Sequence, residues 1–158
     1  MNNNSGFKRI LLVNLPILTG RYTIPDFPPI GIGYLSQTLA QEGIEHDVVD
    51  MMLGYKVDDV ILMIKKHHYD LVGFSLLTYQ YLSSYDIITA IKNKIPSIRI
   101  IVGGPHVSTF REEVLRECDA IDFGVVMEGE IVLRDICKGE LSYQNIPGLI
   151  YRTQNEIK

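Results

Sequence analysis

The sequence predicts an α/β fold: a doubly wound, flavodoxin/Rossmann-like parallel sheet of five strands with helices on both faces. Strand-like and helix-like segments alternate along the chain with short connections, which is typical of βαβ units. Residues 71–74 form an apolar run without polar alternation, as in a strand that is covered on both faces. The expected strand order is 2-1-3-4-5.

The elements follow from short apolar runs and from segments with helical spacing or capping residues. Strands are expected at residues 9–15, 46–51, 71–75, 99–102 and 121–126. Helices are expected at residues 29–42, 57–67, 82–95, from 109 onward, and at 130–138. Residues 146–152 are expected to add a small strand pair. The domain should therefore span residues 8–152, after a flexible tail of residues 1–7.

The first helix has clear ends. Pro29 suits its first turn, and Gly43 suits the position after its last. Gly31 and Gly33 lie inside it, where we expect them to allow close packing of the helix on the sheet. Before this helix, residues 16–29 form a long loop with four prolines, and long loops in compact domains are usually functional.

Two later helices have similar signals. Pro96 ends the third helix, since the residue before a proline disfavours helical backbone. Its apolar stripe at helical spacing consists of Leu82, Tyr85, Ile88, Ile91 and Ile95. Thr109 with Glu112 matches a capping box, which predicts that the fourth helix begins at Thr109.

Composition and charge exclude several classes of function. The 158 residues are 46% hydrophobic and 22% charged, as expected of one globular domain. A formal net charge of −4 does not favour binding to nucleic acid, which is itself negatively charged. No apolar run approaches the roughly 20 residues of a membrane span. Cys118 and Cys137 lack CxxC spacing and are too few for a disulfide framework, which favours a reduced, cytoplasmic protein.

Three ligands that are common in this fold do not match the strand ends. A phosphoacceptor receiver needs acids where this chain has Asn14 and Ser75. A dinucleotide site needs GxGxxG after the first strand, but Gly31-Ile32-Gly33 lacks the third glycine and lies inside a helix. A flavin mononucleotide site needs a hydroxyl-rich phosphate loop, which residues 19–23 match only faintly.

Small residues do end the two central strands. Ser75-Leu76-Leu77 follows one of them, and Gly103-Gly104 ends the other. Because the carboxyl ends of neighbouring parallel strands meet at one edge, these segments should line a common site. The glycine pair would let a bulky planar group lie against the backbone. Ser75 could form a hydrogen bond to that group, and Leu77 could cover it.

These segments resemble the SxL and GG elements of cobalamin-binding domains, which enclose the dimethylbenzimidazole tail of the corrinoid in a slot between the sheet and the last helix. The phrases PPIGIGYLSQTL, VGGPHVS, MEGE and IPGLIYR extend the likeness. Together they resemble the N-terminal domain of cobalamin-dependent radical S-adenosylmethionine (SAM) enzymes, the group that contains the anaerobic magnesium-protoporphyrin IX monomethyl ester oxidative cyclase. The resemblance covers residues 10–152.

The resemblance implies that cobalamin is the cofactor and partner. The cofactor-binding residues that we expect are Arg21, Tyr22, Ser75, Leu76, Leu77, Thr78, Gly103, Gly104, Pro105, His106, Glu128, Gly129 and Glu130. SAM and a [4Fe-4S] cluster would belong to a C-terminal radical SAM domain of the same chain, and residues 153–158 would begin the linker to it. The sequence has no CxxxCxxC motif, so we expect no catalytic centre here, and a methyltransferase or cyclase as the full-length protein.

The chain departs from the family pattern in two places. It lacks the DxHxxG motif that supplies a histidine to cobalt, since no histidine precedes His46. Met127 stands where the usual GEGE motif begins with glycine. We therefore expect base-off cobalamin, with its tail in the slot and its lower face met by the loop of residues 16–29. Arg21 or Tyr22 would lie nearest to that face.

Purely structural roles are an alternative for most of these residues. Ser75 could only end its strand, the glycine pair could only turn the chain, and His106 could lie in a surface loop. Glu128 and Glu130 could only favour a helix N-terminus. The alternative function is a degenerate domain that no longer binds cobalamin and serves as an interaction or structural domain. A stand-alone hydrolase is not supported, because no nucleophile, base and orienting group occur together at the strand ends.

Overall fold

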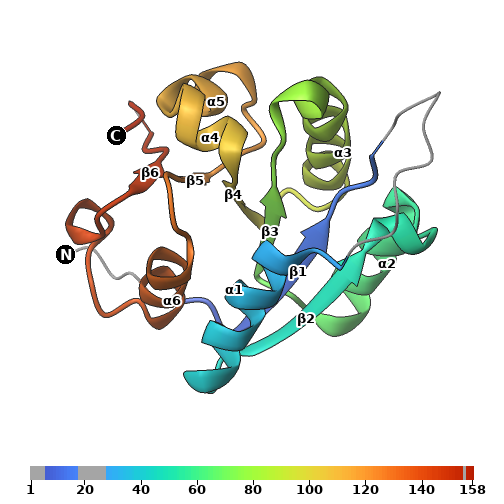
Figure 1. Ribbon diagram of the computed structural model, residues 1–158, viewed down its shortest axis with the longest axis horizontal. Coiled ribbons are helices and arrows are strands. Elements are labelled where there is room, and N and C mark those ends of the chain that lie inside the picture. The colour runs from blue at the N-terminus through green and yellow to red at the C-terminus, as the bar shows by residue number, and fades with distance from the viewer. Residues whose placement is uncertain (1–5, 18–27, 155) are drawn as a thin grey trace.

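The computed structural model describes residues 6–17, 28–154 and 156–158, and Figure 1 shows its central sheet with helices around it. These residues form a six-stranded sheet in the order β2-β1-β3-β4-β5-β6. The strands are β1 (Arg9–Asn14), β2 (Glu45–Asp50), β3 (Leu71–Ser75), β4 (Arg99–Gly103), β5 (Phe123–Val125) and β6 (Leu149–Tyr151). Neighbouring strands from β2 to β5 pair in parallel, and β6 pairs antiparallel with β5. The predicted fold class and strand order are confirmed, with one strand more than predicted.

Helices cover both faces of the sheet. They are α1 (Ile30–Gln41), α2 (Val57–His67), α3 (Tyr81–Lys94), α4 (Pro105–Phe110), α5 (Glu112–Glu117) and α6 (Glu130–Lys138). Short 3₁₀ turns lie at Met51–Leu53 (η1), Thr78–Gln80 (η2) and Tyr143–Asn145 (η3). The helices α1 and α6 pack on one face, and α2 to α5 pack on the other. Each face thus has its own apolar core.

The two cores follow from the alternation of side chains along each strand. In β1, Leu11 and Val13 join the core beneath α2 to α5, whereas Ile10 and Leu12 join the core beneath α1 and α6. All four side chains are at most 2% exposed. The strand is therefore buried on both faces.

The fourth helix differs from the prediction. Helix α4 begins at Pro105, and the chain turns sharply at Arg111 (φ +50°) before α5. Proline has no N–H to lose in a first helical turn and its φ is already helical, so Pro105 outweighs the capping pattern. The Thr109 hydroxyl instead donates to the Pro105 carbonyl, at 2.8 Å. The predicted start at Thr109 is wrong.

Two expectations about packing are also wrong. Leu82 is 64% exposed on α3, because the helix turns its buried stripe toward Tyr85, Ile88 and Ile91. A Cβ atom added at Gly31 or Gly33 would meet no atom within 4 Å. These glycines therefore do not serve close packing of α1 on the sheet.

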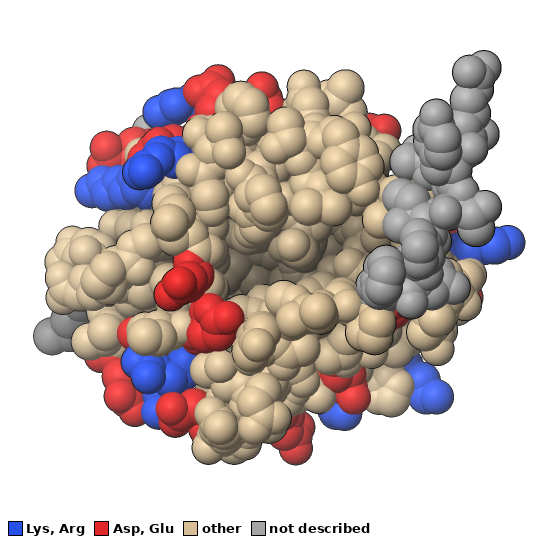
Figure 2. All heavy atoms as spheres, in the orientation of Figure 1, with Lys and Arg blue, Asp and Glu red and all other residues tan. Residues whose placement is uncertain are grey.

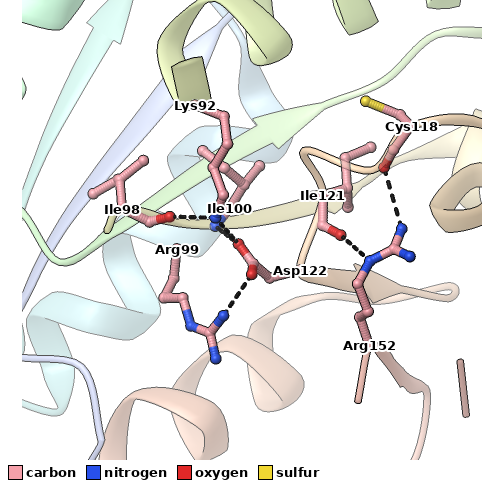
Figure 3. Close-up of polar contacts among 8 residues, drawn as sticks. All are labelled: Lys92, Ile98, Arg99, Ile100, Cys118, Ile121, Asp122 and Arg152. Carbon is pink, nitrogen blue, oxygen red and sulfur yellow. Dashed lines mark hydrogen bonds and ion pairs between the residues drawn. The ribbon is translucent and has the colours of Figure 1, made fainter. Parts of the chain in front are cut away.

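Ion pairs and hydrogen bonds connect neighbouring elements at the amino-terminal edge of the sheet, opposite the carboxyl-terminal edge where the site is expected. Asp122 accepts hydrogen bonds from Lys92 (2.8 Å), Arg99 (2.6 Å) and the Ile100 N–H (2.8 Å), as Figure 3 shows. The Arg152 guanidinium donates to the carbonyls of Cys118 and Ile121, as Figure 3 shows. It also donates to the Leu115 carbonyl.

The segment after β6 folds back on the strand. The Lys158 N–H donates to the Tyr151 carbonyl at 3.0 Å, and Arg152 forms a β-bridge with Ile157. The predicted additional strand pair is therefore built from β6, its partner β5 and this short return.

Candidate functional site

An apolar cavity of about 220 Å³ lies at the carboxyl ends of the central strands, between the sheet and the helices α1 and α6. Strand residues form its floor, and helix residues such as Ile32, Leu35 and Leu133 form its opposite wall. The segment before α6 closes one side with Met127, Glu128, Gly129 and Glu130. In α/β sheets ligands bind at this edge, so the cavity is the candidate site.

Small residues on one sheet face create the cavity. Gly73 and Ser75 on β3 and Gly103 on β4 all line it. The large residues Phe74 and Val102, one position away, face the core beneath α2 to α5. Because neighbouring strand residues point to opposite faces, one face is filled near the strand ends and the other is hollow. A flat apolar group could lie against the exposed backbone there.

Gly104 shapes the turn after β4. Its φ is +96°, and an added Cβ would lie 2.9 Å from both the Leu76 carbonyl oxygen and the Ser75 Oγ. Two hydrogen bonds join the loops here: Leu76 N–H to the Gly103 carbonyl (2.8 Å) and His106 N–H to the Leu76 carbonyl (3.2 Å). Only glycine fits this position without strain. The structure thus brings the two predicted segments together, as their strand ends predict.

The Ser75 hydroxyl is a polar group in a mainly apolar wall. It lines the cavity and forms no hydrogen bond to another described residue. Because this hydroxyl is only half-buried, water can solvate it in the free protein, and a ligand atom could replace that water. This residue therefore offers the cavity one hydrogen bond.

The charged groups of the cavity are both acidic. Glu128 and Glu130 lie at its rim, before and at the start of α6. Figure 2 shows the hollow near the centre of this face, bordered mainly by uncharged residues, with acidic side chains on one side. The carboxylates can accept hydrogen bonds from the amides of a ligand outside the cavity. Between them, Gly129 packs tightly, since a Cβ there would lie 3.2 Å from Leu35.

Six of the predicted residues thus surround the cavity: Ser75, Gly103, Gly104, Glu128, Gly129 and Glu130. Five others lie outside its lining: Leu76, Leu77, Thr78, Pro105 and His106. Leu76 is fully buried in the core beneath α2 to α5, Leu77 is half-buried, and Thr78 and Pro105 are exposed. Arg21 and Tyr22 fall outside the described residues, so the expectation for the cobalt's lower face stays a prediction.

His106 is neither a surface residue nor part of the cavity wall. It is 2% exposed, stacked on Tyr81 at 4.6 Å between ring centroids, and its Nε2 lies 3.1 Å from the Tyr85 hydroxyl. Burial lowers the pKa of its imidazole below the ordinary value, against the opposing effect of Glu117. His106 therefore packs α3 against α4 as a neutral group.

Sequence reasoning missed several lining residues. Gly73, in the middle of β3, is the clearest, because an added Cβ would lie 3.0 Å from Leu12 and 3.4 Å from Ile101. A glycine within an apolar strand is itself a signal of close approach. Gly31 on α1 also lines the cavity, which explains the open space around it.

The other features of the described residues offer less to a ligand. A wider hollow of about 680 Å³ lies between α3 and the turn after α5, and several of its polar groups already pair, as Tyr85 does with Glu117 and Lys92 with Asp122. Within the described ranges, no three His, Cys, Asp or Glu side chains group to hold a metal ion. None of the helices there is long and apolar enough to cross a membrane.

Comparisons with known proteins agree with this geometry. An uncharacterized methyltransferase of Pyrococcus horikoshii is 31% identical over 139 residues, which are 83% of this chain and 29% of that protein. The radical SAM enzyme OxsB, solved with aqua-cobalamin and SAM bound, is 25% identical with a TM-score of 0.82, covering 98% of this chain and 22% of OxsB. TsrM from Kitasatospora setae, solved with cobalamin and a [4Fe-4S] cluster, is 23% identical with a TM-score of 0.71, covering 95% of this chain and 28% of TsrM.

The model of the B12 binding domain family matches residues 22–136, which is more than half of the chain. It spans α1 to most of α6, including both strand ends and the segment before α6. The predicted resemblance and the prediction of cobalamin as cofactor are confirmed, and the alternative of a degenerate domain is not favoured. The chain belongs to the B12-binding domain family.

Proposed function

We propose that this domain holds cobalamin with the nucleotide tail in the cavity and the corrin ring over the carboxyl ends of the strands. The observation that carries the proposal is the glycine-lined hollow beside the unpaired Ser75 hydroxyl. The backbone of Gly103, where a Cβ would meet only Val125 at 3.8 Å, leaves room for a flat ring beside Gly73 and Ser75. Leu35 and Leu133 line the cavity from α1 and α6. The residues present fit a planar aromatic base.

The size of the cavity supports a partial insertion. Pockets that enclose a whole drug-sized ligand measure roughly 300–1,000 Å³. The cavity here measures about 220 Å³, so it suits one ring system of a larger molecule. The remaining corrinoid would lie outside, where the amides at the edge of the corrin ring could donate to Glu128 and Glu130.

A tail held in the cavity would leave the cobalt without its own base, so we propose base-off binding. Among the described residues, no histidine lines the cavity, and His46 is engaged by Ser36 at 2.8 Å and by the Ile44 carbonyl at 2.9 Å. The cob(II)alamin complex should therefore show no nitrogen superhyperfine splitting in electron paramagnetic resonance. Splitting from a nitrogen ligand would contradict base-off binding without histidine.

The whole protein's activity is a further part of the proposal. The chain spans 29% of its Pyrococcus horikoshii relative and 22% of OxsB, so it corresponds to one domain of such proteins. We propose a cobalamin-dependent radical SAM methyltransferase or cyclase, with SAM and the [4Fe-4S] cluster in a C-terminal domain that residues 153–158 would lead to. Cys118 and Cys137 are buried and form no disulfide, as expected of a protein in a reducing cytoplasm.

Gly103 offers the sharpest test of the cavity. A Cβ there would meet only Val125, at 3.8 Å, so Gly103→Leu should fold and fill the hollow. Gly104 is unsuitable, because a side chain there would overlap Leu76 and Ser75. Gly33→Leu is the matched control, since Gly33 lies on α1 away from the cavity lining with open space around it.

The measurement is co-elution of visible absorbance after gel filtration with excess hydroxocobalamin. The wild type and Gly33→Leu should elute coloured, and Gly103→Leu should elute colourless with an unchanged circular dichroism spectrum. A colourless wild type would contradict cobalamin binding by this domain. A folded Gly103→Leu variant that elutes coloured would contradict insertion of the tail.

A further inference from the structure

Met127 has a backbone conformation that side chains rarely adopt. Its φ is +68°, in the left-handed region, where contact between Cβ and the carbonyl oxygen makes residues other than glycine, asparagine and aspartate uncommon. Methionine lacks the carboxylate or amide with which aspartate and asparagine compensate by a local hydrogen bond. The surrounding structure must therefore hold this residue in place.

Contacts on both sides fix this backbone. The Met127 N–H donates to the Ser108 hydroxyl at 2.9 Å, and the preceding Val126 N–H donates to the Gly148 carbonyl at 2.9 Å. Two residues further on, Gly129 lies so close to Leu35 that a Cβ would be 3.2 Å away. Contacts with α1, α4 and the segment before β6 thus hold the turn in this conformation.

The protein itself buries little of the Met127 side chain. It is 74% exposed, although methionine usually packs in the interior. It nevertheless lines the cavity, next to Glu128 in the chain. A strained backbone therefore holds a flexible apolar side chain at the cavity, where a bound molecule would bury it.

We propose that Met127 determines tail specificity: its thioether closes over the aromatic base of an inserted nucleotide tail. This inference rests on the proposed function. Methionine suits the role because its unbranched side chain adapts to a flat ring and sulfur makes favourable contacts with aromatic edges. The residue would then favour corrinoids that carry a tail over corrinoids that lack one.

The test compares hydroxocobalamin with cobinamide, a corrinoid without the nucleotide tail, in titrations followed by visible absorbance. Met127→Ala should weaken hydroxocobalamin binding about ten-fold, from the lost burial of the side chain. Cobinamide affinity should change less than about two-fold, because no tail contact exists to lose. Ile131→Ala is the control, since Ile131 is similarly exposed (60%) nearby on α6 but does not line the cavity.

The Met127→Gly variant distinguishes the effect of backbone strain on stability from the effect of the side-chain contact on binding. Glycine adopts a positive φ freely, so this variant should unfold at a higher urea concentration than Met127→Ala while binding hydroxocobalamin as weakly. Failure of the wild type to bind hydroxocobalamin would overturn the proposed function itself. Unchanged affinity in Met127→Ala, or an equal loss for both corrinoids, would overturn only the role of Met127.

Discussion

Two glycines that look alike in the sequence have opposite environments. Gly104, with φ +96°, has backbone and hydroxyl oxygens 2.9 Å from the position of a Cβ, whereas Gly33, inside α1, has nothing within 4 Å. Gly104→Ala should therefore lower the free energy of unfolding by about 2 kcal/mol, from strain and close contact. Gly33→Ala should raise it by about 0.5–1 kcal/mol, because alanine is the better helix former.

Urea unfolding followed by circular dichroism measures both changes. The opposite signs make each variant the control for the other. Equal midpoints would mean that the turn at Gly104 relaxes to accept a side chain.

His106 should make stability depend on pH. Burial lowers its pKa from the ordinary value of 6.5, so the unfolded state takes up the proton first as pH falls. Where the unfolded state binds more protons, stability rises with pH. The contribution is therefore complete above pH 6.5 and is lost as pH falls below it toward the folded pKa.

The expected result is a steeper loss of unfolding free energy between pH 7.5 and pH 5, roughly, in the wild type than in His106→Gln. Glutamine can still meet the Tyr85 hydroxyl but does not titrate. Parallel pH profiles would show that another group controls acid unfolding.

At the scale of elements, Asp122 fastens β4, β5 and α3 together at the edge opposite the cavity. Its side chain is 11% exposed and pairs with Lys92 and Arg99, whereas the neighbouring Asp119, paired with Arg152, is 93% exposed. Asp122→Ala should cost about 2 kcal/mol, because it leaves Lys92 with the Ile98 carbonyl but without its carboxylate partner and leaves the buried Ile100 N–H without an acceptor. Asp119→Ala should change stability by less than about 0.5 kcal/mol, as for exposed ion pairs.

Denaturant midpoints at constant ionic strength compare these two variants. Raising the salt concentration should reduce the small effect at Asp119 and leave most of the effect at Asp122. Similar costs at both positions would mean that burial does not decide the strength of these pairs.

Local sequence signals predicted most elements correctly and failed where contacts between residues far apart in the sequence determine the structure. The alternation of apolar runs and capped segments fixes α2, β3 and α6 to the residue, because each has its own start and end signals. The start of α4 was misplaced because Pro105 and the turn at Gly104 compete with the capping pattern of Thr109. The orientation of β6 depends on its pairing with β5, which three residues of local sequence cannot specify.

At the scale of the whole molecule, the site was predictable where it depends on strand ends. Ser75, Gly103 and Gly104 follow from the rule that parallel strands present their carboxyl ends at one edge. Gly73 was missed because a cavity wall depends on which sheet face a helix leaves uncovered. The burial of His106 was not predicted because Tyr81 and Tyr85, which contact its ring, lie on α3, and α3 meets α4 only in the folded chain.

A ligand that binds only the folded domain must stabilise the whole molecule. Free hydroxocobalamin at 100 times its dissociation constant should raise the free energy of unfolding by about 2.7 kcal/mol. The shift should appear in urea unfolding of the wild type and Gly33→Leu, with an unchanged slope, since the same surface becomes exposed. Gly103→Leu should show no shift, because a filled cavity removes binding without removing the fold. An equal shift in all three proteins would mean that the ligand stabilises the domain from a place other than the cavity.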